Sequence, residues 1–528
     1  MENTIYSMLP PLLAILMVVL TRRVLLSLGT GIFAAALLLA EFNIGKTVAI
    51  LGDAVKAIFI ADGELNTSSL YIILFLLLLG MITAFISISG GSRAFGDWAM
   101  KRVKTRTGAQ LVGAILGMII FIDDYFNALA VGQITRPITD RQRVSRAKLA
   151  YVIDSTSAPV CVISPISSWG AYIIALIGTI LAAHGVKEYT AFSAFLQMAP
   201  MNFYAIAALA MVFIIALRNI EIGPMKMHEE RAINEGIVVA SDKPVPGELK
   251  DDLPTSNRGT VGDLLWPIAV LVIATVGAML WTGYTAVEGK ATIFKVFENT
   301  DVTKSLVIGG GLGLAVSLIM FARQSLVLKG VSRNAFGKGI LEGIKAMLPA
   351  IYILLFAWVI VDLIGRLETG KYLAGLVESS NMSISFLPFL LFIVAGIMAF
   401  STGTSWGSFG ILLPIAGDIA AAADISILLP ALAAVLAGAV FGDHCSPISD
   451  TTILSSTGAG AHHMDHVMTQ LPYALISAAI AAVGFLMIGF TGSTLIALAA
   501  VVILLIAFAF IFGSKPQEQE VFKENLAE

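Results

Sequence analysis

The chain has 528 residues, of which 57% are hydrophobic and 13% charged, with a formal net charge of −3. Soluble domains carry about 25% charged residues, so this composition excludes an ordinary soluble protein and is typical of a polytopic membrane protein. The apolar runs are continuous rather than alternating, which excludes a β-barrel. The sequence lacks the glycine-rich phosphate loop of an ATP-driven pump, and we expect no nucleic-acid partner.

The apolar runs predict spans near residues 8–20, 24–40, 69–89, 148–184, 190–217, 263–283, 303–323, 343–364, 427–457, 468–490 and 493–513. The runs 148–184 and 427–457 are interrupted. The first run lacks a basic segment before it, so we expect a retained helix rather than a signal peptide. Mixed charges predict a solvated linker at 218–262, and the tail from Lys515 is polar.

Two further apolar stretches have polar centres. Residues 109–134 contain FIDDYFN, and residues 384–422 contain FSTGTSWG. Arg22 and Arg23 favour a cytoplasmic first turn, which puts the N-terminus outside and the C-terminus in the cytoplasm. The basic segments on both sides of 109–134 are cytoplasmic together only if this stretch is a re-entrant hairpin. The same topology makes 384–422 a hairpin that enters from the outside.

The two halves of the chain repeat. Gly91, Gly96 and Gly117 recur at constant spacing as Gly370, Gly375 and Gly396, Phe121 recurs as Phe400, and DSTSAPVCV at 154–162 resembles DHCSPISD at 443–450. The predicted fold is therefore an all-α polytopic membrane protein with two inverted-topology repeats, each with a re-entrant hairpin and a discontinuous helix. The expected parts are N-terminal helices 1–68, first repeat 69–217, cytoplasmic linker 218–262, connecting helices 263–342, second repeat 343–490, and last helix with tail 491–528.

Ionisable residues inside a membrane are costly and are usually functional. The set at membrane depth is acidic apart from one histidine: Asp123, Asp124, Asp154, Asp362, Asp443, His444 and Asp450. Acidic oxygen ligands suit a proton or a hard cation such as sodium. Crowded carboxylates hold a proton more tightly, so sodium and protons can compete for one of them.

Several of these residues also have a structural interpretation. Asp123, Asp124, Asp443 and Asp450 can cap helix ends, and Asp362, near a span end, is expected to be solvated. His444 is either a proton relay or a core histidine with satisfied hydrogen bonds.

Other polar and aromatic residues are weaker candidates. The only two cysteines, Cys161 and Cys445, provide no disulfide framework, and Cys445 beside His444 is a weak zinc signal. His462, His463 and His466 are assigned to a cytoplasmic loop, and a structural role is preferred to pH sensing. Trp169 and Trp406 are expected to pack.

Three long motifs resemble the NhaC family of sodium/proton antiporters: FIDDYFNALAVGQITRPITDRQRVSRAKLAYVIDSTSAPVCVISPISSWGAYI, STGTSWGSFGILLPIA, and FGDHCSPISDTTILSSTGAGAHHMDHVMTQLPYAL. The resemblance implies inverted repeats with paired hairpins, transport by an elevator-like movement, a bacterial inner membrane and a homodimer. Members of the family also include a malate/lactate antiporter driven by sodium and protons.

The resemblance also implies which residues bind the ion. The second repeat would contribute Thr402, Thr404, Ser405, Asp443, Ser446, Asp450, Thr451 and Thr452, and the first Asp123, Asp124, Asn127, Asp154, Ser155 and Thr156. Dicarboxylate carriers of the superfamily have Ser-Asn-Thr at both hairpin tips. This chain has Asp-Asp-Tyr-Phe-Asn and Ser-Thr-Gly-Thr-Ser instead, which argues against dicarboxylate binding.

The sequence therefore predicts a secondary transporter that exchanges sodium for protons by alternating access. The alternative is a sodium-coupled carrier of a small organic solute, an amino acid or a hydroxy-acid such as malate or lactate. A passive channel and an intramembrane enzyme are disfavoured. The expected partners are the lipid bilayer, sodium and protons, with no organic cofactor and no metal other than sodium.

Overall fold

The computed structural model describes residues 2–21, 23–61, 63–121, 123–165, 167–240, 253–287, 289, 291–369, 371–372, 375 and 383–513. Arg22 of the predicted first turn and Gly370 of the predicted repeat lie outside these ranges. So do residues 241–252 of the linker and the tail from Lys515.

The described chain is helical apart from one short antiparallel pair, β1 Ile60–Ala61 and β2 Glu64–Leu65. The first half contains η1 Ile5–Met8, α1 Leu9–Thr21, α2 Val24–Leu39, α3 Ile44–Phe59, α4 Thr67–Ile88, α5 Gly91–Met100, α6 Arg106–Ile119, α7 Asp124–Arg141, α8 Arg146–Ile163, α9 Ser168–Ala183, α10 Ala191–Met198, η2 Ala199–Met201, α11 Phe203–Arg218 and α12 Pro224–Glu235.

The second half contains α13 Gly262–Ala286, α14 Ile293–Glu298, α15 Val302–Ala322, η3 Arg323–Val327, α16 Ala335–Arg366, η4 Ile384–Phe386, α18 Leu387–Thr402, α19 Ser405–Ala423, η5 Ile425–Ile427, α20 Leu428–Cys445, α21 Asp450–Ala459, α22 His463–Thr491 and α23 Thr494–Phe512. The prediction of an all-α polytopic protein is confirmed at this level.

Eight described helices are long and apolar enough to cross a membrane: α4, α13, α15 with η3, α16, α18 with η4, α20 with η5, α22 and α23. A ninth is the pair α10–η2 and α11, which is bent by 49° within the predicted span 190–217. The predicted spans 8–20 and 24–40 correspond to the shorter apolar helices α1 and α2. Helices α1 and α2 have 13 and 16 residues, whereas a crossing needs about 20.

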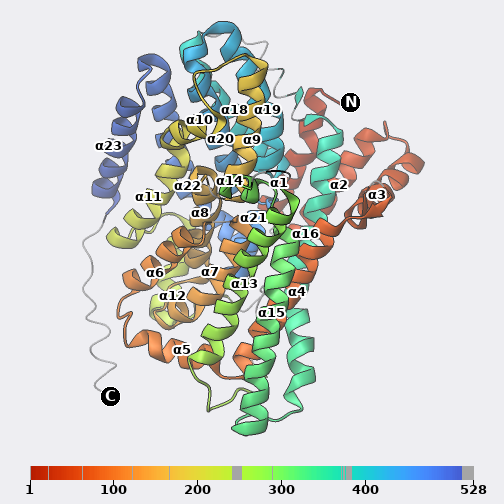
Figure 1. Ribbon diagram of the computed structural model, residues 1–528, viewed down its shortest axis with the longest axis vertical. Helices are drawn as coiled ribbons and strands as arrows, with labels where there is room; N and C mark the ends of the chain where they lie inside the picture. Colours follow the sequence, from red (N-terminus) through yellow and green to blue (C-terminus); the bar gives the residue numbers. More distant parts are fainter. Residues whose placement is uncertain are drawn as a thin grey trace.

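Each of the two predicted hairpins, 109–134 and 384–422, corresponds to a pair of consecutive helices, α6–α7 and α18–α19. Gln142, just after α7, donates a 2.7 Å hydrogen bond to the carbonyl oxygen of Val103, just before α6, so the outer ends of this pair lie together. In the second pair, α18 and α19 are in contact and are joined through Gly403, whose φ of 72° suits a glycine. Figure 1 shows α18 and α19 beside α20, and α6 and α7 in the other half of the molecule.

Two apolar cores meet along α8. The first contains α9, α11, α18, α19, α20 and α22, and the second contains α4, α7, α13, α16 and α21. Tyr151 of α8 faces the first core and Ile153 the second. Helix α20 belongs to the first core and its continuation α21 to the second, so the break between them lies where the cores join.

The predicted linker is only partly solvated at residues 224–235. They form α12, whose Glu229 side chain is 1% exposed and pairs with Arg106 of α6. The ammonium of Lys148 on α8 lies 3.5 Å from Glu229 and 2.6 Å from Glu221. We call these four residues the linker ion cluster. The mixed charges in the sequence predicted a solvent-exposed segment, but in the structure the opposite charges neutralise one another in a buried site.

The electrostatics of the linker ion cluster separate its two acids. Burial, reinforced by the nearby Glu229, raises the pKa of Glu221 to about 7 despite the attraction of Lys148. Burial also acts on Glu229, but Lys148, Arg106 and hydrogen bonds from Ser145 lower the pKa of that carboxyl. Because the backbone N–H of Ser145 donates to Glu229 at 2.7 Å, α12 is fixed to the start of α8.

Candidate functional site

The first helix break, between α6 and α7, presents two buried aspartates. Asp123 caps α7 by accepting a 3.0 Å bond from the N–H of Phe126. Asp124 accepts a 2.9 Å bond from the indole of Trp169 on one oxygen, whereas its other oxygen is buried with no hydrogen-bond partner. Capping therefore accounts for Asp123 but not for Asp124.

Asn127 holds the tip of this hairpin. Its amide nitrogen donates to the carbonyl oxygens of Gly117 at 2.6 Å, Ile120 at 2.7 Å and Thr156 at 3.2 Å. These bonds satisfy carbonyl groups left free where the helix stops. Asn127 thus joins both arms of the hairpin to α8, and only its buried side-chain oxygen lacks a partner.

The second hairpin brings Ser405 to the second broken helix. Ser405 begins α19, and both its N–H, at 3.2 Å, and its hydroxyl, at 2.7 Å, donate to the carboxylate of Asp443 on α20. Thr402 bonds to the backbone of its own helix, with 2.9 Å to the carbonyl oxygen of Met398. Thr404 provides a backbone acceptor for Ser408 at 3.2 Å. Of the three predicted residues here, only Ser405 reaches an acid.

The break between α20 and α21 lies at residues 446–449, inside the predicted discontinuous helix. Ser446 donates a 2.8 Å bond to the carbonyl oxygen of Phe400 at the hairpin tip. Ser449, which the sequence analysis did not single out, donates to Asp443 and lies 2.8 Å from the hydroxyl of Thr451. The hydroxyl of Thr452 is buried without a partner. Asp443 therefore accepts hydrogen bonds from two hydroxyls, those of Ser405 and Ser449.

The two halves meet at a bond between Tyr125 and Asp450. The phenol of Tyr125 on α7 donates to the carboxylate of Asp450 at the start of α21. The charges of Asp123, Asp450 and Asp443 all act on Asp124. The structure thus brings together two pairs of predicted acids, Asp123 with Asp124 and Asp443 with Asp450, that lie more than 300 positions apart in the chain. Asp362 does not join them, because it pairs with Arg366 at 2.8 Å near a helix end.

The predicted interruption of the run 148–184 is present, but it lies after the segment 154–162 that resembles DHCSPISD. Helix α8 continues through this segment, including Pro159, to Ile163, and the break follows at residues 164–167. Ser167 stabilises it by donating to the carbonyl oxygen of Cys161 at 2.7 Å. The signal was present in the sequence, since Ser-Pro-Ile-Ser occurs at both 164–167 and 446–449. Asp154, Ser155 and Thr156 therefore lie within a continuous, buried helix.

Asp154 contacts residues that the sequence analysis did not assign to the site. It accepts bonds from Ser455 at 3.1 Å and Gln470 at 2.7 Å, and His466 lies 3.1 Å away. The assignment to a loop holds for His462, which precedes α22, but is wrong for His463 and for His466, which is 0% exposed and lies within α22. Neither His466 nor Gln470 could be paired with Asp154 from the sequence, because more than 300 residues separate them.

His444 lies in the same buried region. One ring nitrogen is 3.1 Å from the hydroxyl of Ser155, and the other is 2.6 Å from the hydroxyl of Tyr204 on α11. Both nitrogens have partners, which fits a satisfied histidine and also the geometry of a relay. Thr156 bonds to the carbonyl oxygen of Val152 at 2.8 Å within its own helix.

The two tryptophans pack as predicted, and one also reaches an acid. The ring centroids of Trp169 and Trp406 are 5.5 Å apart, and those of Tyr172 and Trp406 are 4.8 Å apart. Because Trp169 donates to Asp124, this aromatic group forms one wall beside the first helix break. It belongs to α9 and α19, the arms that follow two of the breaks.

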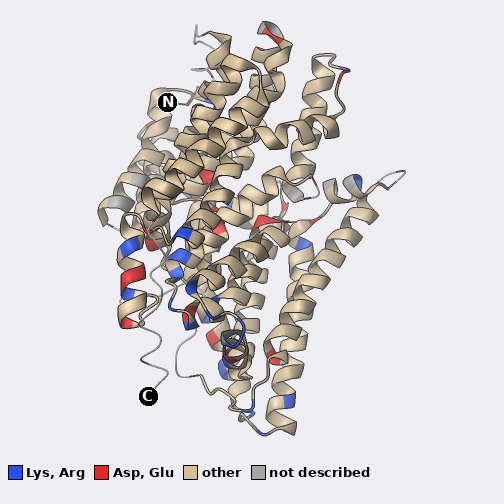
Figure 2. Ribbon diagram, turned by 90° about the vertical axis from the view of Figure 1, so that its left-hand side faces the viewer, with Lys and Arg blue, Asp and Glu red and all other residues tan. Residues whose placement is uncertain are grey.

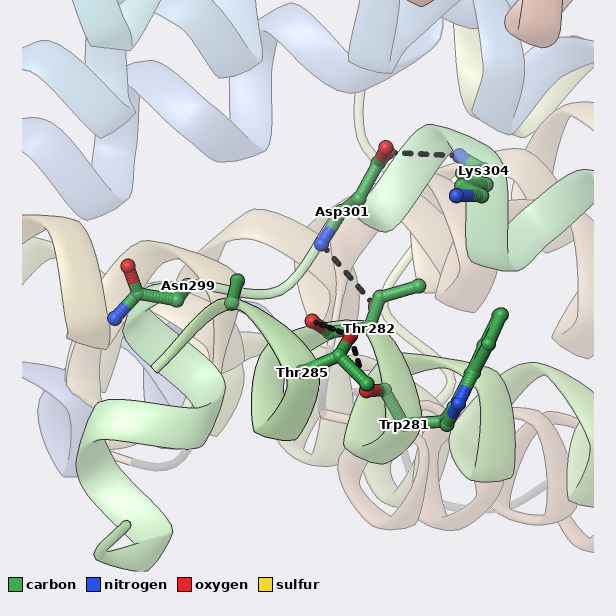
Figure 3. A pocket seen from close by; sticks show the side chains of 7 residues that line it. Trp281, Thr282, Thr285, Asn299, Asp301 and Lys304 are labelled. Atoms are coloured by element: carbon green, nitrogen blue, oxygen red, sulfur yellow. Dashed lines mark hydrogen bonds between the residues drawn. The ribbon is translucent and has the colours of Figure 1, made fainter. Parts of the chain in front are cut away.

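A separate pocket of about 250 Å³ lies among α13, α14 and α15, lined by residues that include Trp281, Thr282, Asp301 and Lys304 (Figure 3). No predicted site residue lines it. Within the described ranges, no three His, Cys, Asp or Glu side chains converge closely enough to hold a metal ion by themselves. A cation among the four acids would therefore need hydroxyl or carbonyl ligands as well.

Comparison with known proteins places the chain in a family. The Na⁺/H⁺ antiporter family matches residues 160–490. An uncharacterized protein of Haemophilus influenzae is 49% identical over 514 residues, which cover 96% of this chain and 95% of that protein. A malate-2H⁺/Na⁺-lactate antiporter of Bacillus subtilis is 32% identical over 213 residues, 38% of this chain and 44% of the relative.

Two further similarities are weaker. An uncharacterized Na⁺/H⁺ antiporter of Haemophilus influenzae is 35% identical over 147 residues, 26% of this chain and 30% of that protein. MtrF of Neisseria gonorrhoeae, from a class of antimetabolite efflux pumps, is 13% identical and covers 90% of this chain and 86% of its own, with a TM-score of 0.32. That score is too low to support a structural argument. The family match, in contrast, confirms the resemblance seen in the motifs: the chain belongs to the Na⁺/H⁺ antiporter family and is a multi-pass membrane transporter rather than an enzyme.

Proposed function

We propose that this transporter exchanges sodium for protons by alternating access, with the ions bound where the helix breaks meet. The observation that carries the proposal is the group of the buried Asp123, Asp124 and Asp443 with the half-buried Asp450, in which one oxygen of Asp124 has no partner. Carboxylates in one dry site repel each other. Binding either a sodium ion or a proton relieves this repulsion. The two ions therefore compete for the carboxylates, and binding of one displaces the other.

The chemistry of the neighbouring groups supports a hard cation. The hydroxyls of Ser405 and Ser449 donate to Asp443, and the hydroxyl of Thr451 lies against that of Ser449. A hydroxyl can rotate and present its lone pairs to a cation, although it now donates to the carboxylate. Broken helices also leave carbonyl oxygens free to coordinate ions. The site would then combine carboxylate, hydroxyl and backbone oxygens, the ligands that suit sodium.

The order of elements supports two repeats of inverted topology. In each half a hairpin, α6–α7 or α18–α19, precedes a broken helix, α8–α9 or α20–α21. Helices α8 and α20 each have 18 residues and end at the same tetrapeptide, Ser-Pro-Ile-Ser. Two related halves that pack around one central site would give the protein two alternative openings.

The charge distribution supports an orientation. Figure 2 shows Lys and Arg gathered mainly in the lower half of the molecule, where Figure 1 places α5, α12 and the turn between α15 and α16. Because basic segments remain on the cytoplasmic side, we assign this end to the cytoplasm and the N-terminal end to the outside. A bacterial inner membrane and a homodimer remain part of the proposal on the family resemblance alone.

The test is proton movement in vesicles that contain the purified protein and a pH dye. An imposed sodium gradient should drive proton movement without any organic solute, and Asp124→Asn should abolish it. Asp53→Asn, which alters an exposed acid on α3, is the matched control and should transport normally. If the folded wild type moves no protons in response to sodium, exchange of these two ions is wrong.

A second candidate is sodium-coupled transport of an organic solute. It is favoured by the partial similarity to the malate-2H⁺/Na⁺-lactate antiporter and by the aromatic wall of Trp169, Tyr172 and Trp406 beside the break. In the same vesicles, sodium-dependent uptake of labelled malate, lactate or an amino acid would distinguish it. Sodium-driven proton flux that is unchanged by these solutes would exclude them as substrates.

A further inference from the structure

The carboxylate of Asp154 differs from the other buried acids in the groups that hold it. Two of its three partners, Gln470 at 2.7 Å and His466 at 3.1 Å, approach through nitrogen atoms. The third is the hydroxyl of Ser455 at 3.1 Å. All three come from α21 and α22, whereas Asp154 lies on α8. The carboxylate therefore joins α8 to two helices, α21 and α22, that lie far away in the chain.

The chemistry of these partners disfavours an ion at Asp154. An amide N–H₂ group donates only, and an imidazole nitrogen that donates to a carboxylate has no lone pair to offer. A cation at this carboxylate would lie against donor hydrogens. Asp443 differs, because two of its three donors are hydroxyls that can reverse their role. The two acids thus have different environments although the sequence assigns both to the ion site.

The bonds continue from Asp154 to the end of α20. Gln470 also donates to the carbonyl oxygen of His444, and Ser155, next to Asp154, lies 3.1 Å from a ring nitrogen of His444. His444 is the neighbour of Asp443 in the chain. The position of the Asp443 carboxylate is therefore tied to α8 and α22 through two separate bonds.

We propose that Asp154, His466 and Gln470 form a positioning group, which we call the α8–α22 brace, and that it orients the end of α20 while the ion binds elsewhere. The inference rests on the proposed exchange of sodium for protons. It reassigns Asp154 from ion ligand to positioning residue and gives His466 and Gln470 a role in transport. The whole group is buried, with Asp154 at 1%, His466 at 0% and Gln470 at 1% exposure.

The brace makes a kinetic prediction that an ion ligand does not. Asp154→Asn, His466→Gln and Gln470→Ala should each lower the maximal rate of sodium-driven proton movement by about tenfold or more, the scale for losing one buried hydrogen bond to a charged group. The apparent KM for sodium should change by less than about threefold, because the ion ligands remain. Combining Asp154→Asn with His466→Gln should cost no more than either alone, since both remove the same connection. His184→Gln, outside the group, is the matched control.

Exchanging the carboxylate of Asp154 and the amide of Gln470 between their two positions provides a rescue experiment. Asp154→Asn combined with Gln470→Glu keeps an amide and a carboxylate facing each other with their roles reversed. This pair should recover part of the lost rate. A rise of tenfold or more in the KM for sodium in Asp154→Asn, with normal kinetics in His466→Gln, would overturn the proposal and restore Asp154 as a ligand.

A measurement without transport separates this inference from the proposed function. Thermal unfolding of the four proteins (wild type, both single variants and the double variant) reports whether Asp154 and His466 act together. A double-variant shift in Tm smaller than the sum of the single shifts supports the brace, even if the wild type moves a different ion. Additive shifts would contradict it, and absent proton movement in wild type would contradict only sodium/proton exchange.

Discussion

The phenol of Tyr125 donates a hydrogen bond to the carboxylate of Asp450, a residue 325 positions later in the chain. Tyr125 belongs to the first turn of α7, and Asp450 is the first residue of α21. One helix follows the break of the first hairpin, and the other follows the break of the second discontinuous helix. This bond therefore connects the two halves of the transporter at the point where their acids meet.

We expect Tyr125→Phe to weaken transport by leaving Asp450 with one fewer donor. A hydrogen bond to a charged group is worth about 1.5–3 kcal/mol, which corresponds to a change of roughly 10- to 100-fold in sodium affinity or rate. Sodium-driven proton movement in vesicles measures it. Tyr284→Phe is the control, because that side chain is 65% exposed. Equal activity of the two variants would show that the bond has no role in transport.

Removing the acid that lacks a partner should have the largest effect. Asp124→Asn keeps the shape of the side chain and its bond from Trp169, but it removes a charge that a sodium ion or a proton would neutralise. We expect sodium-dependent proton flux to fall at least about 100-fold. This is the upper end of the effect of losing a single hydrogen bond to a charged group, which costs about 1.5–3 kcal/mol, or roughly 10- to 100-fold. A variant that retains more than a tenth of the wild-type flux would remove Asp124 from the site.

The crossing of α7 and α21 should not tolerate a side chain. A Cβ atom on Gly132 would lie 2.4 Å from the backbone of Gly458. We expect Gly132→Ala to force these helices apart and lower stability by about 1–3 kcal/mol. Gly277→Ala is the matched control, since a Cβ on Gly277 of α13 meets nothing within 4 Å. That change should slightly stabilise its helix, by about 0.5–1 kcal/mol, so the two Tm shifts should have opposite signs.

The two acids of the linker ion cluster, Glu221 and Glu229, should make the stability of the protein depend on pH in opposite directions. Burial, together with repulsion from Glu229, raises the pKa of Glu221 from 4.5 to about 7. The folded protein thus holds this proton at pH values where the unfolded chain has released it. The stability that this proton provides is complete below pH 4.5 and is lost as the pH rises through about 7. Glu221→Gln should therefore gain in Tm relative to wild type between pH 5 and pH 8.

Glu229 should show the reverse. Burial opposes its ionisation, but Lys148, Arg106 and the hydrogen bonds from Ser145 lower its pKa below 4.5. Its contribution to stability is present above pH 4.5 and is lost as the pH falls through the lower value in the folded protein. Glu229→Gln should therefore be less stable than wild type at pH 8. Tm measured in detergent at both pH values checks the pair, and a common sign would contradict this account.

Much of the fold could be predicted from the sequence because membrane helices are a local property. A span needs about 20 apolar residues, and an interruption by Gly, Pro and Ser is visible without knowing what packs beside it. This local signal located α4, α13, α15 and the helix pairs α6–α7 and α18–α19, and it located the break at 446–449. In the first half, the resemblance of DSTSAPVCV to DHCSPISD pointed to a segment that lies before the break, because α8 continues through Pro159 to Ile163 and the Ser-Pro-Ile-Ser segment after it provides the end.

The sequence by itself thus determined a polytopic helical membrane protein of the Na⁺/H⁺ antiporter family, together with the acids Asp123, Asp124, Asp443 and Asp450. Only the tertiary structure decided which groups touch them. Tyr125 meets Asp450, Ser449 turns back to Asp443, and His466 and Gln470 hold Asp154. Composition also made α12 look solvated, although Glu229 is buried against Lys148 and Arg106. The physical reason is the same in each case: the environment of a buried charge is set by side chains from helices that lie far away in the chain and become neighbours only when the two cores pack together.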